Sequence, residues 1–500
     1  MTLPRFYEQR GYQPAWIDDS GLKPQVEGLV RMLRAAAQEG LNPLDYHLTE
    51  IEAKREAIRA DRRRVNPDRL TELDLLLTDA YLLYGYHLLA GKVNPETIDP
   101  EWFIARRKAD LVTILQNALD SNQVEASLRS LLPSHSGYYA LRGALAAHRA
   151  IAAQGGWAAV PDGPGLRKGD RDPRVESLRV RLTAAGDLET KEVFDKELFD
   201  EDLDRALQKF QGRHGLNSSG GLNANTLTAL NLPAEVRVRQ IMVNMERCRW
   251  LPQDLGEQYI MVNIANFELD VVEADRVVMT MRVVVDRPYR RTPVFSDMIT
   301  YLVFCPYWHV PKGIAAADIL PQLRRDIGYL TQNNIKVFPE WGPESKEIDP
   351  TGVDWFRVNS GNLNYRFRQE PGPSNALGRI KFMFPNKFNV YLHDTPSREL
   401  FAVSERTFSS GCIRIERPLD LAEYLLRDEP GWKREKIIAV IEKNVEQTKR
   451  LPRPVTIHLL YLTAWAENDG RVQFRNDIYL RDEPVYQALT ERPVSIDGRE

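Results

Sequence analysis

The spacing of hydrophobic residues changes once along this chain, and that change constrains the fold more than any other feature. From Leu22 to about Ala152, apolar residues recur at helical spacing, and turn signals such as Gly91-Lys92-Val93-Asn94-Pro95 separate the segments. After about Val236, runs of β-branched and aromatic residues indicate strands. The sequence therefore predicts a multidomain α+β protein, with an all-α region first and a β-rich region last.

The length supports this division, because 500 residues exceed what one hydrophobic core usually holds together. A stretch rich in Gly and Pro, from Gln154 to Pro173, is predicted to be a linker. We therefore expect a helical scaffold domain over residues 1–165, with charged residues such as Arg62 to Arg64 on its solvated face. A compact helical module over 166–233 and a β-rich domain over 234–500 should follow.

An insertion interrupts the β pattern over about residues 308–380. It begins with a helical stretch, Ala315 to Ile327, and continues through a long segment rich in Gly, Pro, Asn and Ser. Loops this long inside a compact domain are usually functional lids or disordered. If the insertion is a lid, its aromatic residues Trp341, Trp355 and Tyr365 either face a substrate or, more commonly, pack within the lid itself.

The residues that carry chemistry cluster between Lys387 and Pro418. Phe388 to His393 has the composition of a strand, and strand side chains alternate faces, so Tyr391 and His393 are expected on one face. Further along, Cys412 directly follows a glycine, which can adopt backbone angles that other residues avoid. Consecutive backbone N–H groups there can face a single point.

This pattern favours nucleophilic acyl transfer. If the segment after Cys412 is extended, Arg414 shares its face, and a guanidinium there favours the thiolate that attacks carbonyls. His393 precedes Cys412 by enough chain to leave a strand, form a loop and return, so a nucleophile, a base and oxyanion donors can converge. Either residue alone is more often structural; the combination favours a catalytic pair.

His393 followed by Ser409-x-Gly411-Cys412-Ile413-Arg414 resembles the signature of the YkuD-type L,D-transpeptidases, the cysteine enzymes that cross-link bacterial peptidoglycan. The resemblance implies Cys412 as nucleophile and His393 as general base. It further implies that the oxyanion and substrate are bound by the residues around them, namely Tyr391, Ser409, Ser410, Gly411 and Arg414.

The chain departs from the family pattern in two places. Many members have His or Arg where this chain has Ser410. Many also have Asn-x-Asp a few residues after the arginine, where this chain has Arg417-Pro418-Leu419. No role that depends on that Asn or Asp is carried over.

Several further segments are similar to the large periplasmic YcbB-like branch of this family. They are Phe6-Tyr7 through Pro14-Ala15-Trp16, Met245-Glu246-Arg247 with Arg249-Trp250-Leu251-Pro252, Val310-Pro311-Lys312, Pro371-Gly372-Pro373 with Asn375-Ala376-Leu377-Gly378, and Phe384-Pro385-Asn386. This likeness implies a capping subdomain over the catalytic cleft at the insertion, and a periplasmic location. The opening residues MTLPRFYEQR have no apolar core of a signal peptide, so the likeness also implies that the export segment is missing here.

The module over 166–233 resembles the three-helix peptidoglycan-binding module. The residues that carry this likeness are Phe210-Gln211-x-x-His214-Gly215-Leu216, then Gly220-Gly221-Leu222 and Thr226-Leu227. The second glycine-rich loop usually contains Asp-Gly, where this chain has Ser219-Gly220. The module is expected either to bind the wall or to serve as a rigid spacer.

Composition excludes several other classes of function. The formal net charge of −3 offers no electrostatic basis for binding nucleic acid or anionic membranes, and no apolar run is long enough for a membrane span. Three cysteines are too few and too scattered for a disulfide framework. A zinc site formed by Cys305, His309, His393 and Cys412 is disfavoured, because Pro306 prevents an ordinary helix from aligning the first pair. No metal or cofactor is expected.

The resemblance implies a peptidoglycan L,D-transpeptidase that forms 3→3 cross-links between meso-diaminopimelate residues through a thioester on Cys412. Its partners would be donor and acceptor stem peptides, with cell-wall synthesis proteins as further candidates, and carbapenems would acylate it. Alternatives are an L,D-carboxypeptidase, a cell-wall cysteine amidase and a non-catalytic wall-binding scaffold. In the amidases the cysteine generally precedes the histidine, whereas here His393 precedes Cys412.

Overall fold

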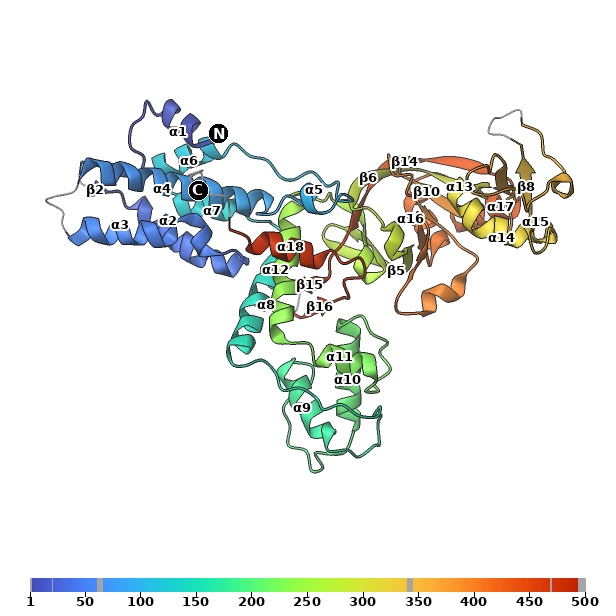
Figure 1. Cartoon of the computed structure of the whole chain (residues 1–500), viewed down its shortest axis with the longest axis horizontal. Helices are drawn as coiled ribbons and strands as arrows, with labels where there is room; N and C mark the ends of the chain where they lie inside the picture. The colour runs from blue at the N-terminus through green and yellow to red at the C-terminus, as the bar shows by residue number, and fades with distance from the viewer. Residues whose placement is uncertain (1, 20, 61–65, 340–344, 468–469, 493–500) are drawn as a thin grey trace. The chain divides into compact units, whose positions relative to one another are not determined.

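The structure is a computed structural model that describes residues 2–19, 21–60, 66–339, 345–467 and 470–492. The chain separates into two compact units (Figure 1). The first unit consists of Met1–Asp254 with Leu462–Glu500, and the second unit of Leu255–Tyr461. Helices dominate the first unit and strands the second, which confirms the predicted multidomain α+β class. Arg62–Arg64 and Trp341 lie outside the described residues.

Polar side chains set the ends of the helices in the N-terminal domain. α4 (Pro67–Ala90) begins where the side chain of Asn66 accepts a hydrogen bond from the Asp68 N–H, and it ends at Gly91, whose φ is 81°. Asp110 caps α6 (Leu111–Asp120) in the same way. The other elements of this domain are α1 (Thr2–Gln9), β1 (Ile17–Asp18), β2 (Gly21–Leu22), α2 (Gln25–Arg34), α3 (Leu48–Ala60), α5 (Pro95–Ile98), α7 (Val124–Ser130) and α8 (Ser136–Ala153).

A helix at the start of the predicted β-rich domain belongs instead to the first unit. α12 (Ala234–Trp250) packs along α8 (Figure 1). Asn244 donates to the Thr463 hydroxyl at 2.8 Å, and Arg247 forms an ion pair with Asp482 at 2.5 Å. These contacts tie the C-terminal elements β15 (Ala464–Ala466), β16 (Val472–Phe474) and α18 (Asp482–Thr490) to α12. The β-rich unit is therefore 255–461, where the sequence predicted 234–500.

A buried ion pair anchors α12 in the first unit. Neither Glu246 nor Arg249 is exposed, and their side chains lie 2.5 Å apart. Glu246 also accepts from the Val93 N–H at 2.7 Å, and Arg249 bonds to the Tyr138 hydroxyl at 3.1 Å. The YcbB-like segment around residues 245–252 therefore has a structural role here, because it joins α12 to the chain at Val93 and to Tyr138 on α8.

We predict that Glu246→Gln lowers the free energy of unfolding of the first unit by about 3 to 5 kcal/mol, because it removes the ion-pair partner of the buried Arg249 charge and leaves only the more distant Glu39 to offset it. The glutamine oxygen can still accept from Val93, so the variant isolates the loss of charge. Urea unfolding followed by tryptophan fluorescence measures the change. The control is Glu56→Gln on exposed α3, where the partner Arg59 is 3.9 Å away. Equal effects of the two substitutions would contradict the prediction.

The module within the first unit has three helices, α9 (Arg174–Ala184), α10 (Glu201–Arg213) and α11 (Ala224–Leu230). Their core contains Val175, Leu178, Leu182, Phe199, Leu203, Leu207, Phe210, Leu222, Leu227 and Leu230. Gln211 is fully buried and donates to the carbonyl of Gly221 at 2.8 Å, while its oxygen accepts from the Gly220 N–H at 2.9 Å. The glycine-rich loop is therefore fixed by the side chain of α10, a structural use of the motif residues.

The second unit is built on a sheet of nine strands in the order β12-β5-β13-β11-β10-β6-β14-β3-β4. Because β4 pairs with β5 as well as β3, the sheet closes on itself. The strands are β3 (Gln258–Asn263), β4 (Glu268–Glu273), β5 (Arg276–Asp286), β6 (Phe295–Phe304), β10 (Ile380–Met383), β11 (Leu392–His393), β12 (Thr407–Ser409), β13 (Ile413–Ile415) and β14 (Gln447–Leu460).

One strand of this unit is shorter than predicted. The strand expected at Phe388–His393 is only Leu392–His393, because Asn389 adopts a left-handed conformation with a φ of 56°. Two helices follow the strands of this region: α16 (Pro418–Leu426) packs on β14 and β10, and α17 (Arg434–Glu442) ends shortly before β14 begins at Gln447.

The insertion has a small core of its own. Its sheet has the order β7-β9-β8, formed by β7 (Trp308–His309), β9 (Arg366–Gln369) and β8 (Ile335–Phe338), and its helices are α13 (Lys312–Ile314), α14 (Leu320–Leu323) and α15 (Gly328–Gln332). Trp355 is 5% exposed, and its ring lies 5.2 Å from that of Tyr365. Of the two expectations for these aromatics, packing within the insertion is therefore correct. Among described residues, no helix is both long and apolar enough to cross a bilayer.

Candidate active site

Neighbouring strands bring four of the predicted site residues to one face of the sheet. β11 pairs in parallel with β13, so that His393 lies opposite Arg414, and the Ile413 N–H donates to the Tyr391 carbonyl at 3.1 Å. Residues two apart share a face, so Tyr391 and Cys412 lie beside His393 and Arg414 on it. The face therefore combines a thiol, a phenol, an imidazole and a guanidinium.

Cys412 is partly exposed, and its sulfur forms a hydrogen bond with the Tyr391 hydroxyl. Burial raises the pKa of the Cys412 thiol to about 12, and the nearby Asp286 carboxylate adds to the rise. The thiol is therefore protonated at neutral pH. This differs from the expectation that Arg414 would favour the thiolate, because desolvation outweighs the neighbouring positive charges.

His393 is buried, and its Nδ1 bonds to the carbonyl of Asp394. A carbonyl only accepts, so Nδ1 carries the proton and Nε2 is the basic nitrogen. Burial lowers the pKa of His393 to about 3, and the Arg414 guanidinium adds to the effect, so the ring is neutral. In the described part of the chain, no hydrogen bond joins this ring to the Cys412 sulfur; the ring lies 5.8 Å from the Tyr391 ring.

The loop before Cys412 is held by a carboxylate that sequence reasoning missed. Gly411 has a φ of 136°, a backbone conformation that only glycine adopts without strain. Its N–H donates to the side chain of Asp286, so it is not available to an oxyanion in this conformation, and Cys412 supplies the next backbone N–H. Burial raises the pKa of Asp286 to about 6, against opposing hydrogen bonds from Gly411 and Thr292.

Ser409 and Ser410 serve the same loop. Ser409 is buried, hydrogen-bonds to Asp286, and its carbonyl accepts from the Arg287 N–H at 3.2 Å. The carbonyl of Ser410 accepts from the Arg290 guanidinium at 2.8 Å. These contacts connect the loop to the end of β5.

A lysine on β10 completes this face and was also missed. Lys381 lies opposite His393 in the sheet, and its ammonium is 4.0 Å from the centroid of the Tyr391 ring. Burial lowers the pKa of Lys381. The sequence indicates only that Lys381 lies between the apolar residues Ile380 and Phe382 of a strand and so faces the opposite side of the sheet from them. The strand order of the sheet is what brings Lys381 near Cys412.

Arg414 carries unsatisfied hydrogen-bonding capacity. Its buried Nε has no hydrogen-bond partner among the described residues. Burial lowers the pKa of Arg414, and the neighbouring Arg287 guanidinium lowers it further. Two guanidinium groups that repel one another on the cysteine face suit a ligand that carries carboxylates.

Across the ranges that the structure describes, no three His, Cys, Asp or Glu side chains are grouped to hold a metal ion. Cys305, one of the residues of the zinc site that the sequence disfavoured, is buried, and its sulfur contacts the Ile441 carbonyl at 3.2 Å.

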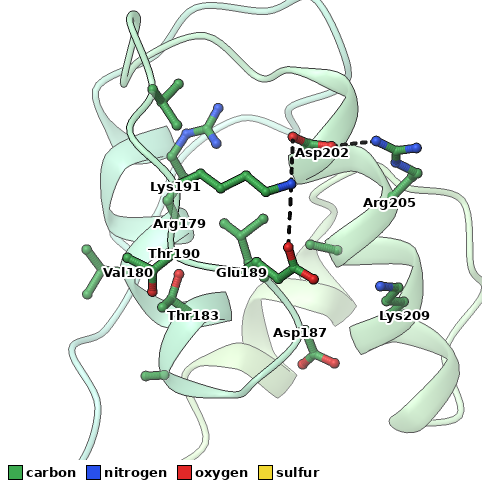
Figure 2. A pocket seen from close by; sticks show the side chains of 14 residues that line it. Arg179, Val180, Thr183, Asp187, Glu189, Thr190, Lys191, Asp202, Arg205 and Lys209 are labelled. Carbon is green, nitrogen blue, oxygen red and sulfur yellow. Dashed lines mark hydrogen bonds and ion pairs between the residues drawn. The ribbon is translucent and has the colours of Figure 1, made fainter.

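A second candidate site is a hollow in the module, with a volume of about 670 Å³ between α9, α10 and the segment that joins them (Figure 2). Lys191 extends across it toward Glu189 at 3.5 Å and Asp202 at 4.0 Å, and Asp202 also pairs with Arg205 at 2.5 Å. The described lining residues are Arg179, Val180, Thr183, Ala184, Asp187, Leu188, Glu189, Thr190, Lys191, Val193, Asp202, Arg205, Ala206 and Lys209, and none is aromatic.

The motif histidine of the module does not line this hollow. His214 is buried and stacks on Phe210, with ring centroids 3.8 Å apart. Burial, followed by the nearby Arg237, holds the pKa of His214 well below its usual value. His214 is therefore a core residue, and the polar rim of the hollow comes from positions that the motif does not mark.

Sequence profiles of three domain families match this chain. The scaffold domain matches residues 1–145, the domain described as "Putative peptidoglycan binding domain" matches residues 171–230, and the L,D-transpeptidase catalytic domain, YkuD, matches residues 257–450. The last of these matches contains the whole face that carries Tyr391, His393 and Cys412.

A curated relative from Haemophilus influenzae, named "Putative L,D-transpeptidase", is 34% identical over 252 residues, which are 50% of this chain and 49% of the relative. The chain thus spans about half the length of that relative.

Two solved structures were also matched, each over 60% of this chain and 100% of its own. An L,D-transpeptidase from Xylanimonas cellulosilytica has 13% identity and a TM-score of 0.18, and a fused Zn-dependent amidase/peptidase/peptidoglycan-binding domain-containing protein from Clostridium acetobutylicum has 10% and 0.16. These scores are too low to carry an argument.

We predict that alkylation of Cys412 by iodoacetamide accelerates about tenfold for each pH unit between pH 7 and 9, without a plateau. The reason is that burial raises the thiol pKa to about 12, so the reactive thiolate fraction grows throughout this range. Peptide-resolved mass spectrometry measures the rate at Cys412 separately from Cys248 and Cys305. A plateau below pH 8 would reveal a preformed thiolate and contradict the prediction.

Proposed function

We propose that this chain, which carries a YkuD-type L,D-transpeptidase catalytic domain and a peptidoglycan-binding domain, is a peptidoglycan L,D-transpeptidase that forms 3→3 cross-links through a thioester on Cys412. The observation that carries the proposal is the shared face of Tyr391, His393 and Cys412, on which a thiol meets a hydroxyl donor beside a neutral imidazole. The proposed site is periplasmic, where stem peptides and the proteins that build the wall are found.

In the first half-reaction, the Cys412 sulfur attacks the carbonyl that joins the L-centre of meso-diaminopimelate to the terminal D-alanine of a tetrapeptide stem. An S–C bond forms, the C–N bond breaks, and D-alanine leaves. The sulfur starts protonated, so its proton passes to the neutral His393 as the bond forms and then to the leaving amine. Because burial disfavours the charged ring and lowers the pKa of His393, His393 would keep this proton only briefly before it passes to the leaving amine.

Tyr391 and the backbone of Cys412 are the proposed oxyanion donors. The N–H of Gly411 is engaged with Asp286, which leaves the Cys412 N–H as the nearest backbone donor. Burial, followed by the Cys412 charge, raises the pKa of Tyr391 above its usual value, so the hydroxyl stays protonated and can donate. Asp286 and the positive φ of Gly411 would fix where the backbone donor points.

In the second half-reaction, the side-chain amine of meso-diaminopimelate in another stem attacks the thioester. A C–N bond forms, the S–C bond breaks, and the released sulfur takes a proton from the attacking amine, which restores the thiol. Stem peptides carry several carboxylates, and the arginines around Cys412 suit them. The insertion adds Arg366 and Arg368, whose charges reach His309 together with that of Lys381, and we propose that it covers the donor peptide.

The hollow in the module is proposed to hold a stem peptide and so to keep the enzyme on its polymeric substrate. Sugars are usually held against aromatic rings, and the described lining has none. Its mixed charges and its aliphatic residues, such as Val180 and Leu188, suit a short peptide with both amines and carboxylates. The module would therefore bind the stem peptide rather than the glycan strand.

We predict that the full chain converts purified disaccharide tetrapeptide into a cross-linked dimer with release of D-alanine, and that Cys412→Ser abolishes both while Cys248→Ser and Cys305→Ser do not. Liquid chromatography with mass spectrometry identifies the products, and intact mass detects the acyl-enzyme or a carbapenem adduct. Tripeptide without dimer would instead identify an L,D-carboxypeptidase. Turnover by Cys412→Ser would contradict the proposed nucleophile.

We predict that Tyr391→Phe lowers the turnover number by about 10²- to 10³-fold without a matching loss of thermal stability, because it removes one oxyanion donor and leaves the ring in place. The same chromatographic assay gives the rate. Tyr301→Phe on β6, a half-buried tyrosine of the same unit, is the matched control. An unaltered rate in Tyr391→Phe would remove Tyr391 from the mechanism.

We predict that Lys191→Ala with Asp202→Ala weakens binding of the full chain to intact sacculi at least several-fold, because it removes the ion pairs across the hollow. Sedimentation with sacculi measures binding, in a Cys412→Ser background that prevents turnover. Sacculi stripped of stem peptides should bind neither form. Lys196→Ala, which breaks an exposed pair with Glu176 outside the hollow, is the control. Undiminished binding by the double variant would exclude this hollow.

A further inference from the structure

Lys381 is a cation that the mechanism above does not use. It enters the cysteine face from β10, two strands away from Cys412, with β11 between them. Its ammonium lies 4.0 Å from the centroid of the Tyr391 ring. Among the described residues, the aromatic ring is the close partner that the structure shows for this partly buried ammonium.

Such a placement is unusual for a lysine. Lysines are mostly exposed, and a partly buried ammonium normally has a carboxylate within hydrogen-bond distance. Burial lowers the pKa of Lys381, which shows that the charge is poorly solvated here, and the two groups that oppose this shift are Cys412 and Glu446. The ring of Tyr391 provides a partial substitute through its π face.

The charge of Lys381 is coupled to the sulfur from both directions. A negative charge on Cys412 raises the pKa of Lys381, and the ammonium of Lys381 lowers that of Cys412. Tyr391 lies between them, because its hydroxyl bonds to the sulfur while its ring lies under the ammonium. The three side chains therefore form a continuous line from the cation to the reacting atom.

We propose that Lys381 is a positioning residue for acylation, which holds the Tyr391 ring against Cys412 and supplies the positive charge that favours the thiolate as it forms. This inference rests on the proposed role of Cys412 as nucleophile. The negative charge that appears on the sulfur during attack would provide the counter-charge that the ammonium lacks in the resting site.

Other charged groups act on the same sulfur and must be kept constant in a test. Asp286 on β5 opposes the thiolate, and the hydrogen bonds of Tyr391 favour it. Further charged or titratable neighbours are His393 on β11, Arg414 on β13, Arg287 after β5, Glu446 before β14, and His309 on β7, whose pKa the charge of Lys381 lowers. A variant at Lys381 leaves all of these groups in place.

The test is the pH dependence of Cys412 alkylation by iodoacetamide, which requires no stem-peptide turnover. In Lys381→Met, which keeps the length and loses the charge, we expect alkylation to be about tenfold slower at pH 7 to 8, as for a rise of one pKa unit at the sulfur. The difference should shrink once the pH is high enough for the wild-type ammonium to lose its proton, and burial lowers the pKa of Lys381 so that this occurs earlier than for an exposed lysine. A purely structural role would produce no such convergence.

Lys381→Arg should restore the rate, since a guanidinium keeps its charge and stacks on an aromatic ring. It should also keep the advantage over Lys381→Met at pH 10. Lys387→Met is the matched control, because that lysine also lies over an aromatic ring, 5.1 Å from the Phe388 centroid. Equal pH profiles for wild type and Lys381→Met would overturn the inference, whereas stem-peptide turnover by Cys412→Ser would overturn the proposed function instead.

Discussion

The parallel pairing of β11 with β13 is the constraint on which the rest of the candidate site depends. It joins a two-residue strand to a three-residue strand, and it alone sets His393 opposite Arg414. A slip of one residue would turn Cys412 to the other face of the sheet. Such short strands would hold their register poorly in isolation. Here the register is fixed because β10 and β5 flank the pair and the sheet closes through β4.

Burial on this face determines which charges are present before substrate arrives. The thiol and the imidazole are both neutral, because desolvation raises the pKa of one to about 12 and lowers that of the other to about 3. The charged groups around the pair are the cations Lys381 and Arg414 and the carboxylate of Asp286, which opposes the thiolate. The negative charge on the sulfur itself therefore develops only as it attacks the acyl donor. A protonated thiol also reacts slowly with oxidants, since the thiolate is the reactive form.

The sequence predicted the features that local pattern controls. The change from helical to strand spacing, the helices of the module, the conformation of Gly411 and the common face of Tyr391 and His393 all follow from residues that are close along the chain. The features that were missed depend on distant pairings. Nothing near α12 indicates that Asn244 meets Thr463, and nothing near Gly411 indicates that its N–H is taken by Asp286. Lys381 belongs to the site only because β10 lies beside β11.

Resemblance to a family does not by itself separate residues that act from residues that support, but their position relative to a partly exposed nucleophile does. Glu246 and Arg249 lie in a segment as family-like as the cysteine motif, yet both are buried and satisfy each other's charge. His214 is likewise enclosed between aromatic rings. By contrast, Arg414 and Lys381 lie beside a partly exposed sulfur, and the Nε of Arg414 has no hydrogen-bond partner among the described residues. Cationic groups around a partly exposed nucleophile are placed where a substrate can reach them, whereas the buried ion pair of Glu246 and Arg249 is not.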